Sequence, residues 1–356
     1  MQVDYAPLSY MSSDLPLVME GSLRIAPFLQ VPNLLVEFGL DPASITAEAG
    51  LDIGLFDDPE QGIPLAAAGR LLALAAERSG CPSFGHRLGE QVGLDALGRI
   101  GQLAKSAPDV STALHQVVLY LHLHDRGAVP ALWISADRVV MAYVVYQAEV
   151  PGIEHIYDGA VAITFNIVKL LCGAGFEPIE VRLSRPRPAD VEPYRRFYRS
   201  RISFGAEHSA VVFSADWLKR PLDGADGVLH KQLLQIIEFA DVRGEENLVA
   251  NLRRVIRCIL VQGVAPEDTS LAHIARLFSL HRRTLNRRLQ SLGTTFKTLI
   301  DEARYDVARQ LLRDTSLPVV DIAASLDYAD AAAFSRAFKR WSGVSPGAWR
   351  RSLPPP

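Results

Sequence analysis

The last third of the chain carries one pattern of apolar and polar positions twice, over about 269–290 and about 318–341. Each copy has an Ile-Ala pair, an apolar residue three positions after that alanine, a short turn, and then the run apolar-x-Arg-x-apolar. The small alanine lets two helices cross closely, while the run packs two side chains inward and turns an arginine outward. Each copy therefore predicts two short packed helices, the second with a basic outer face.

A long amphipathic helix is predicted between the two copies, from Thr295 to Leu312. Its apolar residues fall on one stripe: Phe296, Leu299, Ile300, Ala303, Val307, Ala308 and Leu311. Thr294 or Thr295 is available to cap its first turn. Such a stripe would fasten the two helix pairs into one body.

Apolar residues also recur at helical spacing through the front of the chain. The predicted helices are Ile25–Phe38, Leu65–Glu77, Gly93–Ala107, Val110–Leu121 and Tyr157–Leu171. Short segments rich in β-branched and aromatic residues are predicted as strands: Ala131–Ser135, Val139–Tyr146, Pro178–Leu183 and Ala210–Phe213. These elements predict one α+β unit, with helices ahead of a modest sheet.

A further predicted helix, Val228–Asp241, is followed by the polar run Arg243–Asn247, which breaks the pattern. A domain boundary is expected there. A helix from about Leu248 to Val261 would open the second unit. The predicted fold is thus an α+β amino-terminal domain, residues 1–240, followed by an all-α domain, residues 245–356.

Charge is unevenly divided along the chain. The 356 residues carry a net charge of −3. The segment Pro266–Pro356 holds 14 Lys and Arg against 9 Asp and Glu, so it carries +5 and the remainder carries −8. Positive charge is therefore concentrated where the repeated pattern lies, as binding to nucleic-acid phosphates requires.

Composition and cysteine use indicate an ordinary globular protein. Hydrophobic residues make up 49% of the chain and charged residues 22%, as in soluble domains. Cys81, Cys172 and Cys258 are far apart, so neither a CxxC metal pair nor a disulfide framework is indicated. The amino terminus has no basic region followed by an apolar core, and no stretch approaches a membrane span. We expect a cytoplasmic protein with no membrane partner.

Three stretches of the basic region carry a family resemblance: Arg283–Leu289, Gly293–Phe296 and Ala333–Pro346. With these in order and correctly spaced, the segment from about Leu248 to Arg350 resembles the DNA-binding domain of the AraC/XylS transcription regulators. The resemblance implies two helix-turn-helix units joined by one long helix, binding to double-stranded promoter DNA, and contact with RNA polymerase. Asp327 stands where the family usually has glycine; aspartate tolerates a left-handed backbone, so the turn is expected to survive.

The stretch Phe204–Leu218, with Pro193 and Tyr194 ahead of it, carries a second resemblance. It is similar to the amino-terminal effector-binding domain of the arabinose-binding-like branch of AraC regulators. That similarity implies a small-molecule effector and a homodimer. It does not identify the effector or the residues that bind it.

The second helix of the first copy carries groups that can read bases. Leu285 and Leu289 are expected to pack inward, which leaves four side chains facing outward: Arg282, Arg283, Asn286 and Arg287. Arginine matches the two acceptors of guanine, and asparagine can bond adenine on two atoms. By position in the family motif, His281 corresponds to the helix cap. Arg283, Asn286 and Arg287 correspond to positions that contact bases in the family. The alternative is a solvated basic helix face.

The second copy offers less chemistry for reading bases. Its outward places hold Ala331, Ala332 and Ala333, and a methyl group can touch thymine but cannot discriminate by hydrogen bonds. Asp330 is expected to cap this helix. We expect three basic side chains to meet phosphates or one base: Arg336, Lys339 and Arg340. This unit would anchor more than it reads, unless these residues are only solvated surface.

Other constellations give weaker signals. His122 and His124 would point to the same side of a strand and could hold a metal with His115 or His155, but histidines at such spacing more often serve as packed or polar residues. Five aromatic residues either line an effector pocket or belong to the core: Trp133, Tyr143, Tyr146, Tyr157 and Phe165. No glycine-rich phosphate loop or nucleophile elbow is present in the sequence. We therefore predict no metal, no cofactor and no catalytic residues.

These features predict a sequence-specific DNA-binding transcription regulator, an effector-responsive activator of a metabolic or catabolic operon. Two alternatives stay open. One is a constitutive regulator with a ligandless front domain. The other is an enzyme with a DNA-binding tail.

Overall fold

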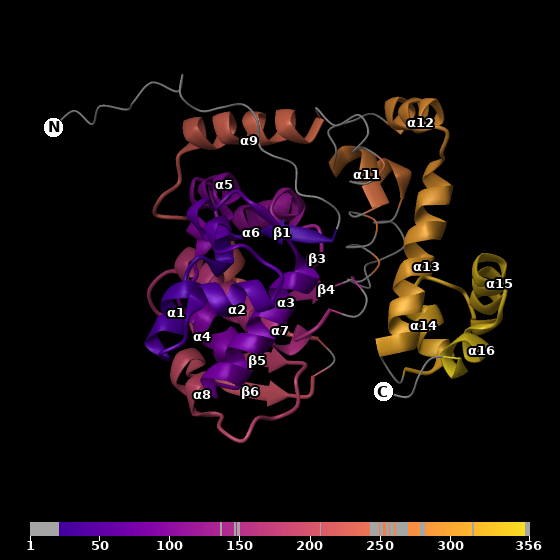
Figure 1. Ribbon diagram of the computed structural model, residues 1–356. Helices are drawn as coiled ribbons and strands as arrows, with labels where there is room; N and C mark the ends of the chain where they lie inside the picture. The colour runs from indigo at the N-terminus through magenta and orange to yellow at the C-terminus, as the bar shows by residue number, and fades with distance from the viewer. Residues whose placement is uncertain are drawn as a thin grey trace.

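The computed structural model describes residues 21–135, 137–145, 147, 150–206, 208–242, 249, 252–253, 256, 260, 270–277, 282–314 and 317–352. Up to residue 242 these form a part with both helices and strands, and from residue 270 a part with helices alone (Figure 1). Three predicted segments lie outside the described residues. They are the polar run 243–247, the start and most of the helix expected from Leu248, and the turn between the two helices of the first copy, which includes His281.

Short helices fill the chain ahead of the main sheet. In order they are η2 (Ala26–Phe28), α1 (Val31–Glu37), α2 (Pro42–Glu48), η3 (Ile53–Asp57), α3 (Leu65–Ser79), α4 (Phe84–Glu90), η4 (Leu94–Leu97), α5 (Arg99–Lys105), α6 (Val110–Tyr120) and η5 (Leu121–Leu123). The helices predicted at Leu65–Glu77 and Val110–Leu121 are confirmed as α3 and α6.

Two predicted helices are divided in the structure. The stretch Ile25–Phe38 forms η2 and α1, each with a proline at its start, because proline lacks the backbone N–H that a helix interior needs. The stretch Gly93–Ala107 forms η4 and α5, which meet at Gly98 with a φ of 55°. That backbone conformation interrupts a right-handed helix and is adopted readily by glycine.

The main sheet has five strands in the order β3-β4-β7-β5-β6. They are β3 (Ala128–Ile134), β4 (Arg138–Val145), β5 (Glu180–Leu183), β6 (Arg201–Phe204) and β7 (Ala210–Ser214). The β5–β6 pair is parallel and the other pairs are antiparallel. Each of the four predicted strands coincides with one of these, whereas β6 was not predicted. A separate two-stranded sheet joins β1 (Ser22–Arg24) to β2 (Gly62–Pro64).

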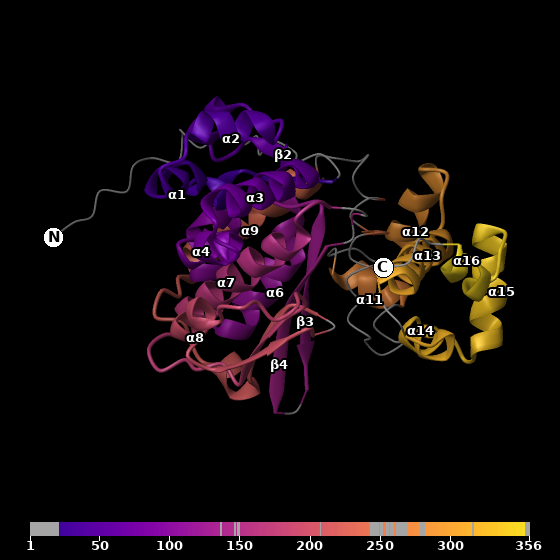
Figure 2. The same ribbon diagram turned by 60° about the horizontal axis from the view of Figure 1, so that its bottom comes forward.

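Helix α7 (Ile153–Cys172) forms the centre of this part and confirms the helix predicted at Tyr157–Leu171. It contacts β4 and β7 on one side and α3 and α4 on the other, so the sheet, α7 and the earlier helices form successive layers (Figure 2). Helices α8 (Glu192–Tyr198), η6 (Ala215–Lys219) and α9 (Gly227–Val242) complete it.

Glycines let α4 and α7 approach closely. A Cβ atom at Gly89 would lie 2.5 Å from the carbonyl oxygen of Gly159, and one at Gly85 would lie 2.2 Å from that of His155. Real side chains do not tolerate such separations, so the crossing requires glycine.

Helix α7 is also the one candidate membrane span among the described residues. It is 20 residues long with a mean hydropathy of 1.2, but 61% of that stretch is buried inside the protein. Its contacts with the sheet and with α4 give it the surroundings of a core helix.

The histidine arrangement expected from the sequence is wrong. His122 lies in η5 and His124 follows that turn as its C-cap, so the two histidines do not share one side of a strand. Helix α6 runs directly into the 3-10 turn η5, and β3 starts only at Ala128, so neither histidine lies in a strand. Across the described ranges, no three His, Cys, Asp or Glu side chains gather as a metal site.

The carboxyl-terminal part is built around α13 (Phe296–Asp314), which occupies the stretch where a long helix was expected. Before it come α11 (Leu271–Leu277) and α12 (Arg282–Ser291), and after it α14 (Val319–Ser325), α15 (Ala331–Ser342) and α16 (Pro346–Arg351). The Thr295 hydroxyl accepts a hydrogen bond from the backbone N–H of Thr298, 3.1 Å away, and so caps α13. Figure 1 shows α12 near one end of α13 and α14 to α16 near the other.

Candidate nucleic-acid interface and effector cavity

Packing fixes which face of α12 is exposed. Leu285 and Leu289 are fully buried, in one apolar cluster with Ile274 and Ala275 of α11 and with α13 residues. These two leucines are four residues apart, so the opposite face of α12 is turned to solvent. The inward positions predicted for them are confirmed.

The four outward residues predicted from the sequence come together on one surface of α12. Arg282, Arg283, Asn286 and Arg287 are exposed. They line one concave surface with Leu271, Thr284 and Gln290, and none of these seven residues is acidic. We call this surface the α12 face. It offers guanidinium and amide donors close together, which can bond base edges or phosphates.

Sequence reasoning missed two polar residues of the α12 face, Thr284 and Gln290. Gln290 follows Asn286 by four residues and Arg287 by three, so helical spacing alone puts it on their side. Its amide can donate and accept hydrogen bonds as that of Asn286 can.

Helix α15 presents a different surface. Phe334 and Phe338 are fully buried, and Ala332, Arg336, Lys339 and Arg340 are exposed. The Asp330 carboxylate accepts a hydrogen bond of 2.6 Å from the backbone N–H of Ala333, so the predicted cap is confirmed. The three basic residues share one side of the helix, and Arg340 has Asp301 of α13 at 3.7 Å.

The turn ahead of α15 keeps its shape without glycine. Asp327 has a φ of 61°, the left-handed conformation expected there. Its carboxylate pairs with the Arg304 guanidinium at 3.1 Å, and that guanidinium also lies over the Tyr328 ring. The turn is thereby tied to α13.

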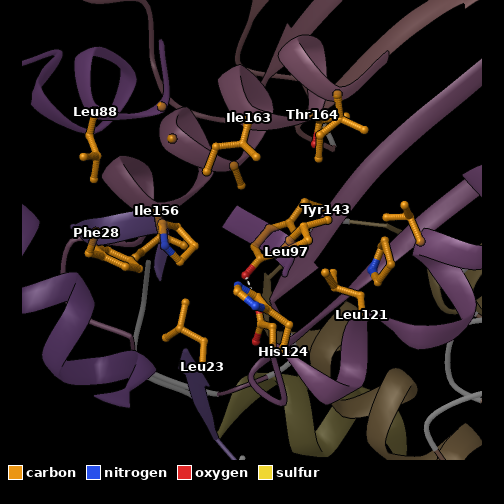
Figure 3. A pocket seen from close by; sticks show the side chains of 18 of the residues that line it. Leu23, Phe28, Leu88, Leu97, Leu121, His124, Tyr143, Ile156, Ile163 and Thr164 are labelled. Atoms are coloured by element: carbon orange, nitrogen blue, oxygen red, sulfur yellow. Dashed lines mark hydrogen bonds between the residues drawn. The ribbon is translucent and has the colours of Figure 1, made fainter. Parts of the chain in front are cut away.

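A cavity of about 90 Å³ lies in the amino-terminal part, between α7 on one side and β3, β4 and the first helices on the other. Seventeen of its 21 lining residues are apolar, and the other four are His124, Asp125, Tyr143 and Thr164. Figure 3 shows Phe28, Ile156 and Ile163 around this space, with His124 and Tyr143 at its edge. Of the five aromatic residues considered from the sequence, Tyr143 lines the cavity and Tyr146 lies outside the described residues. The other three are engaged elsewhere: Trp133 stacks on His208, Phe165 packs against Phe197, and the Tyr157 hydroxyl accepts a hydrogen bond from the Val145 N–H.

Most polar atoms at the cavity are already bonded within the protein. Asp125 Oδ1 accepts hydrogen bonds from the N–H groups of Gly127 and Ala128, and Oδ2 accepts one from the Tyr143 hydroxyl. His124 differs, because its Nε2 atom is buried without a partner. Burial and the nearby Arg24 guanidinium lower the pKa of His124 to about 3, so its imidazole is neutral.

A second group of buried polar side chains lies away from the cavity. The Arg185 guanidinium and the Tyr194 hydroxyl both donate to Asp158 Oδ2, and burial raises the pKa of that carboxyl despite the arginine. These bonds join α7 to α8 and to the loop after β5. None of the three residues lines the cavity, and their hydrogen bonds to one another indicate a structural role.

Comparison with known proteins relates both parts to one family. Residues 39–222 match the model described as the arabinose-binding domain of AraC transcription regulator, N-term, and residues 274–352 match a helix-turn-helix domain model. The ornithine utilization regulator of Pseudomonas aeruginosa is 24% identical over 90% of this chain and 94% of its own length. The transcriptional regulator VirS of Mycobacterium tuberculosis is 26% identical over 89% and 93%.

Among solved structures, the transcriptional regulator CdpR of Pseudomonas aeruginosa is 22% identical, with a TM-score of 0.47, over 92% of this chain and 98% of its own. The family resemblance inferred from the sequence is confirmed by the two matching models. The chain belongs to the AraC family of transcription regulators, with an amino-terminal arabinose-binding-type domain and a carboxyl-terminal helix-turn-helix domain that binds DNA.

Proposed function

We propose that this regulator is an effector-responsive activator that reads its promoter with the α12 face. The observation that carries the proposal is that Arg287 is exposed on the side of α12 opposite the buried Leu285 and Leu289, with Arg283 and Asn286 exposed beside it. A helix anchored in this way can enter the major groove with its donors toward base edges.

In this proposal α11–α12 and α14–α15 are two helix-turn-helix units, and α13 sets the distance between them. A helix of 19 residues is about 28 Å long at 1.5 Å per residue, which is close to one turn of DNA at about 34 Å. The two units would therefore reach successive major grooves on one side of the duplex.

The two helix-turn-helix units have different roles in this proposal. Arg283, Asn286 and Arg287 read bases, and Arg282 adds charge at the start of the helix. The phosphates of the DNA backbone are contacted by Arg336, Lys339 and Arg340. The alanines ahead of these residues offer only methyl groups, which cannot form hydrogen bonds with bases.

Family membership supports a wider organisation as part of this proposal. Residues 1–240 form the effector-binding and dimerisation domain and residues 245–356 the DNA-binding domain. The protein acts in the cytoplasm as a homodimer that contacts RNA polymerase. We infer that it is not an enzyme, because the relatives it matches over most of its length are transcription regulators.

A mobility-shift titration of the full chain tests the proposal, using the DNA upstream of its own gene and a scrambled duplex. We expect the upstream duplex to bind more tightly and its affinity to fall steeply with salt, because each phosphate contact releases a counterion. Equal affinity for the two duplexes at every salt concentration would refute sequence-specific reading.

A further inference from the structure

We propose that the effector is a small, uncharged, mostly apolar molecule that occupies the cavity beside α7 and forms one hydrogen bond, to His124. This inference rests on the effector-responsive function proposed above and names the class of ligand. The family model that matches this domain is named for binding of the sugar arabinose, whereas the residues that line this cavity are mostly apolar.

The cavity lies where the two apolar cores of the amino-terminal part meet. Leu23, Phe28 and Ile156 belong to one core, and Leu97, Val117 and Ile167 to the other. An occupant would touch α7, β4 and the first helices at once. Its binding would therefore stabilise one arrangement of these elements, which is the physical basis on which a ligand can shift a conformational equilibrium.

Size limits the occupant. An apolar cavity of about 150 Å³ is known to stay dry and to accept benzene. The cavity here is smaller, about 90 Å³, so a single ring or a short chain of roughly five to seven non-hydrogen atoms would fit only once the lining side chains move apart slightly.

Polar groups restrict the occupant further. The Tyr143 hydroxyl and both oxygens of Asp125 already take part in hydrogen bonds, so they are not open to a ligand without losing those bonds. His124 lines the cavity, and among the described residues its buried Nε2 atom has no partner, so a small rotation of the imidazole would present this atom to a ligand. A buried atom of this kind is costly unless something bonds to it, and a ligand carrying one polar group would do so.

A sugar or an ionised ligand does not fit these surroundings. A pentose carries several hydroxyl groups, and beside His124 the cavity offers the Thr164 hydroxyl and otherwise mainly hydrocarbon, so most of them would be buried without partners. A carboxylate would lose its hydration and would lie beside Asp125 and a neutral His124, with no cation in the lining.

Calorimetric titration of the full chain tests the proposal with four probes: phenol, benzene, benzoate and L-arabinose. We expect saturable binding of phenol, weaker binding of benzene by about threefold to tenfold, the usual effect of one hydrogen bond, and none of benzoate or L-arabinose. In the His124→Leu variant, phenol and benzene should bind with similar affinity, because the hydrogen-bonding group is gone.

Filling the cavity supplies the control for location. Ala160 lines the cavity from α7, so Ala160→Phe should abolish phenol binding and the milder Ala160→Val should weaken it. Ala47→Phe, at an exposed position of α2, is the matched control and should bind phenol as the native chain does. If Ala160→Val is folded and neither Ala160 variant weakens phenol binding, the ligand lies elsewhere and the proposal is overturned.

The same samples separate this inference from the proposed function. Saturable binding of L-arabinose or benzoate, or no heat from phenol, in a chain that still binds its upstream DNA would overturn the apolar effector and leave the regulator intact. Binding of phenol as predicted by a chain that shows no preference for its upstream DNA would instead refute the proposed function.

Discussion

Single residues decide whether the α12 face reads bases or only attracts phosphate. Arg287 and Asn286 are exposed neighbours on a helix whose other side is fixed by two buried leucines, so their positions are set by packing. Arg340 on α15 has Asp301 at 3.7 Å, which leaves it partly engaged within the protein. This difference in surroundings leads to different expected effects of mutation.

Replacing Asn286 or Arg287 by Ala should cost about 1–3 kcal/mol at the cognate site and relax preference at one base, because a bidentate partner is lost. Replacing Arg340 by Ala should weaken cognate and scrambled DNA about equally, since phosphate contacts carry no sequence information. A competition titration of each variant against the two duplexes at fixed salt measures both effects.

Gln290→Ala serves as a test of the residue that sequence reasoning missed. Gln290 lies on the α12 face, so this variant should lose affinity for the cognate duplex more than for the scrambled one.

The roles of the two helix pairs would be reversed by one combined outcome. In that outcome the Asn286 and Arg287 variants lose affinity for both duplexes alike, while the Arg336 or Arg340 variants lose discrimination between them.

The buried His124 should make stability fall in acid. Its pKa is lowered from 6.5 to about 3 by burial and by the Arg24 guanidinium. Between pH 6.5 and pH 3, the imidazole is therefore protonated in the unfolded chain and neutral in the folded chain. Stability is then complete above pH 6.5 and decreases as the pH falls toward 3, by about 1.4 kcal/mol per pH unit for one proton.

Urea unfolding of native and His124→Leu protein between pH 7 and 4 measures this contribution. The variant should show a pH dependence shallower by close to one proton. His115→Leu, at an exposed position of α6, is the control and should follow the native protein. Parallel curves for native and His124→Leu protein would contradict a buried neutral imidazole.

At the scale of elements, the spacing of apolar residues predicted helices and strands well wherever one face packs against the core and the other is exposed to solvent. α12 and α15 appear in their predicted stretches, each ending one residue later than predicted, with their predicted residues buried. The errors come where local backbone chemistry divides a periodic run. Pro32 and Gly98 each end a pattern that apolar spacing alone would continue.

The crossing of α4 and α7 gives a prediction about an element contact. Gly89→Ala should destabilise the protein by about 1–3 kcal/mol, because the added methyl group would meet the Gly159 carbonyl at 2.5 Å and force the helices apart. Gly93→Ala is the matched control, since a Cβ atom there meets nothing within 4 Å. Thermal unfolding of the two variants compares them, and equal melting temperatures would mean that the crossing adjusts freely.

At the scale of the whole molecule, the sequence predicted the exposed basic surface of α12 better than the cavity. Six of the seven residues of the α12 face come from one helix, so spacing within a few residues was enough to place them together. The cavity is lined from Leu23 to Ile167 by elements that meet only in three dimensions. Apolar spacing shows which side chains turn inward, but whether facing side chains leave a gap depends on volumes summed across all of them.

The α9 helix divides the apolar stripe that the sequence shows between Val228 and Asp241. Leu233 and Ile237 are buried against α5 and its neighbours within the same chain. Leu229, at the start of the stripe, is 41% exposed, and the neighbouring Val228, outside the stripe, is 71% exposed, so apolar surface remains at the start of α9. This remaining part is what a second copy of the chain could cover, whereas the buried part already has its partner.

We therefore predict that the full chain dimerises through the exposed apolar start of α9, at Val228 and Leu229. Leu229→Glu, alone or combined with Val228→Glu, should shift a dimer toward monomer at tens of micromolar, on the order of weak-dimer affinities, because each added carboxylate would lose its hydration in the interface. Val36→Glu, at a residue of α1 with 62% exposure, is the control and should leave the association unchanged. Sedimentation velocity over a concentration series distinguishes the outcomes. A native chain that stays monomeric at every concentration, or a dimer that the α9 variants do not weaken, would remove α9 as the contact between protomers.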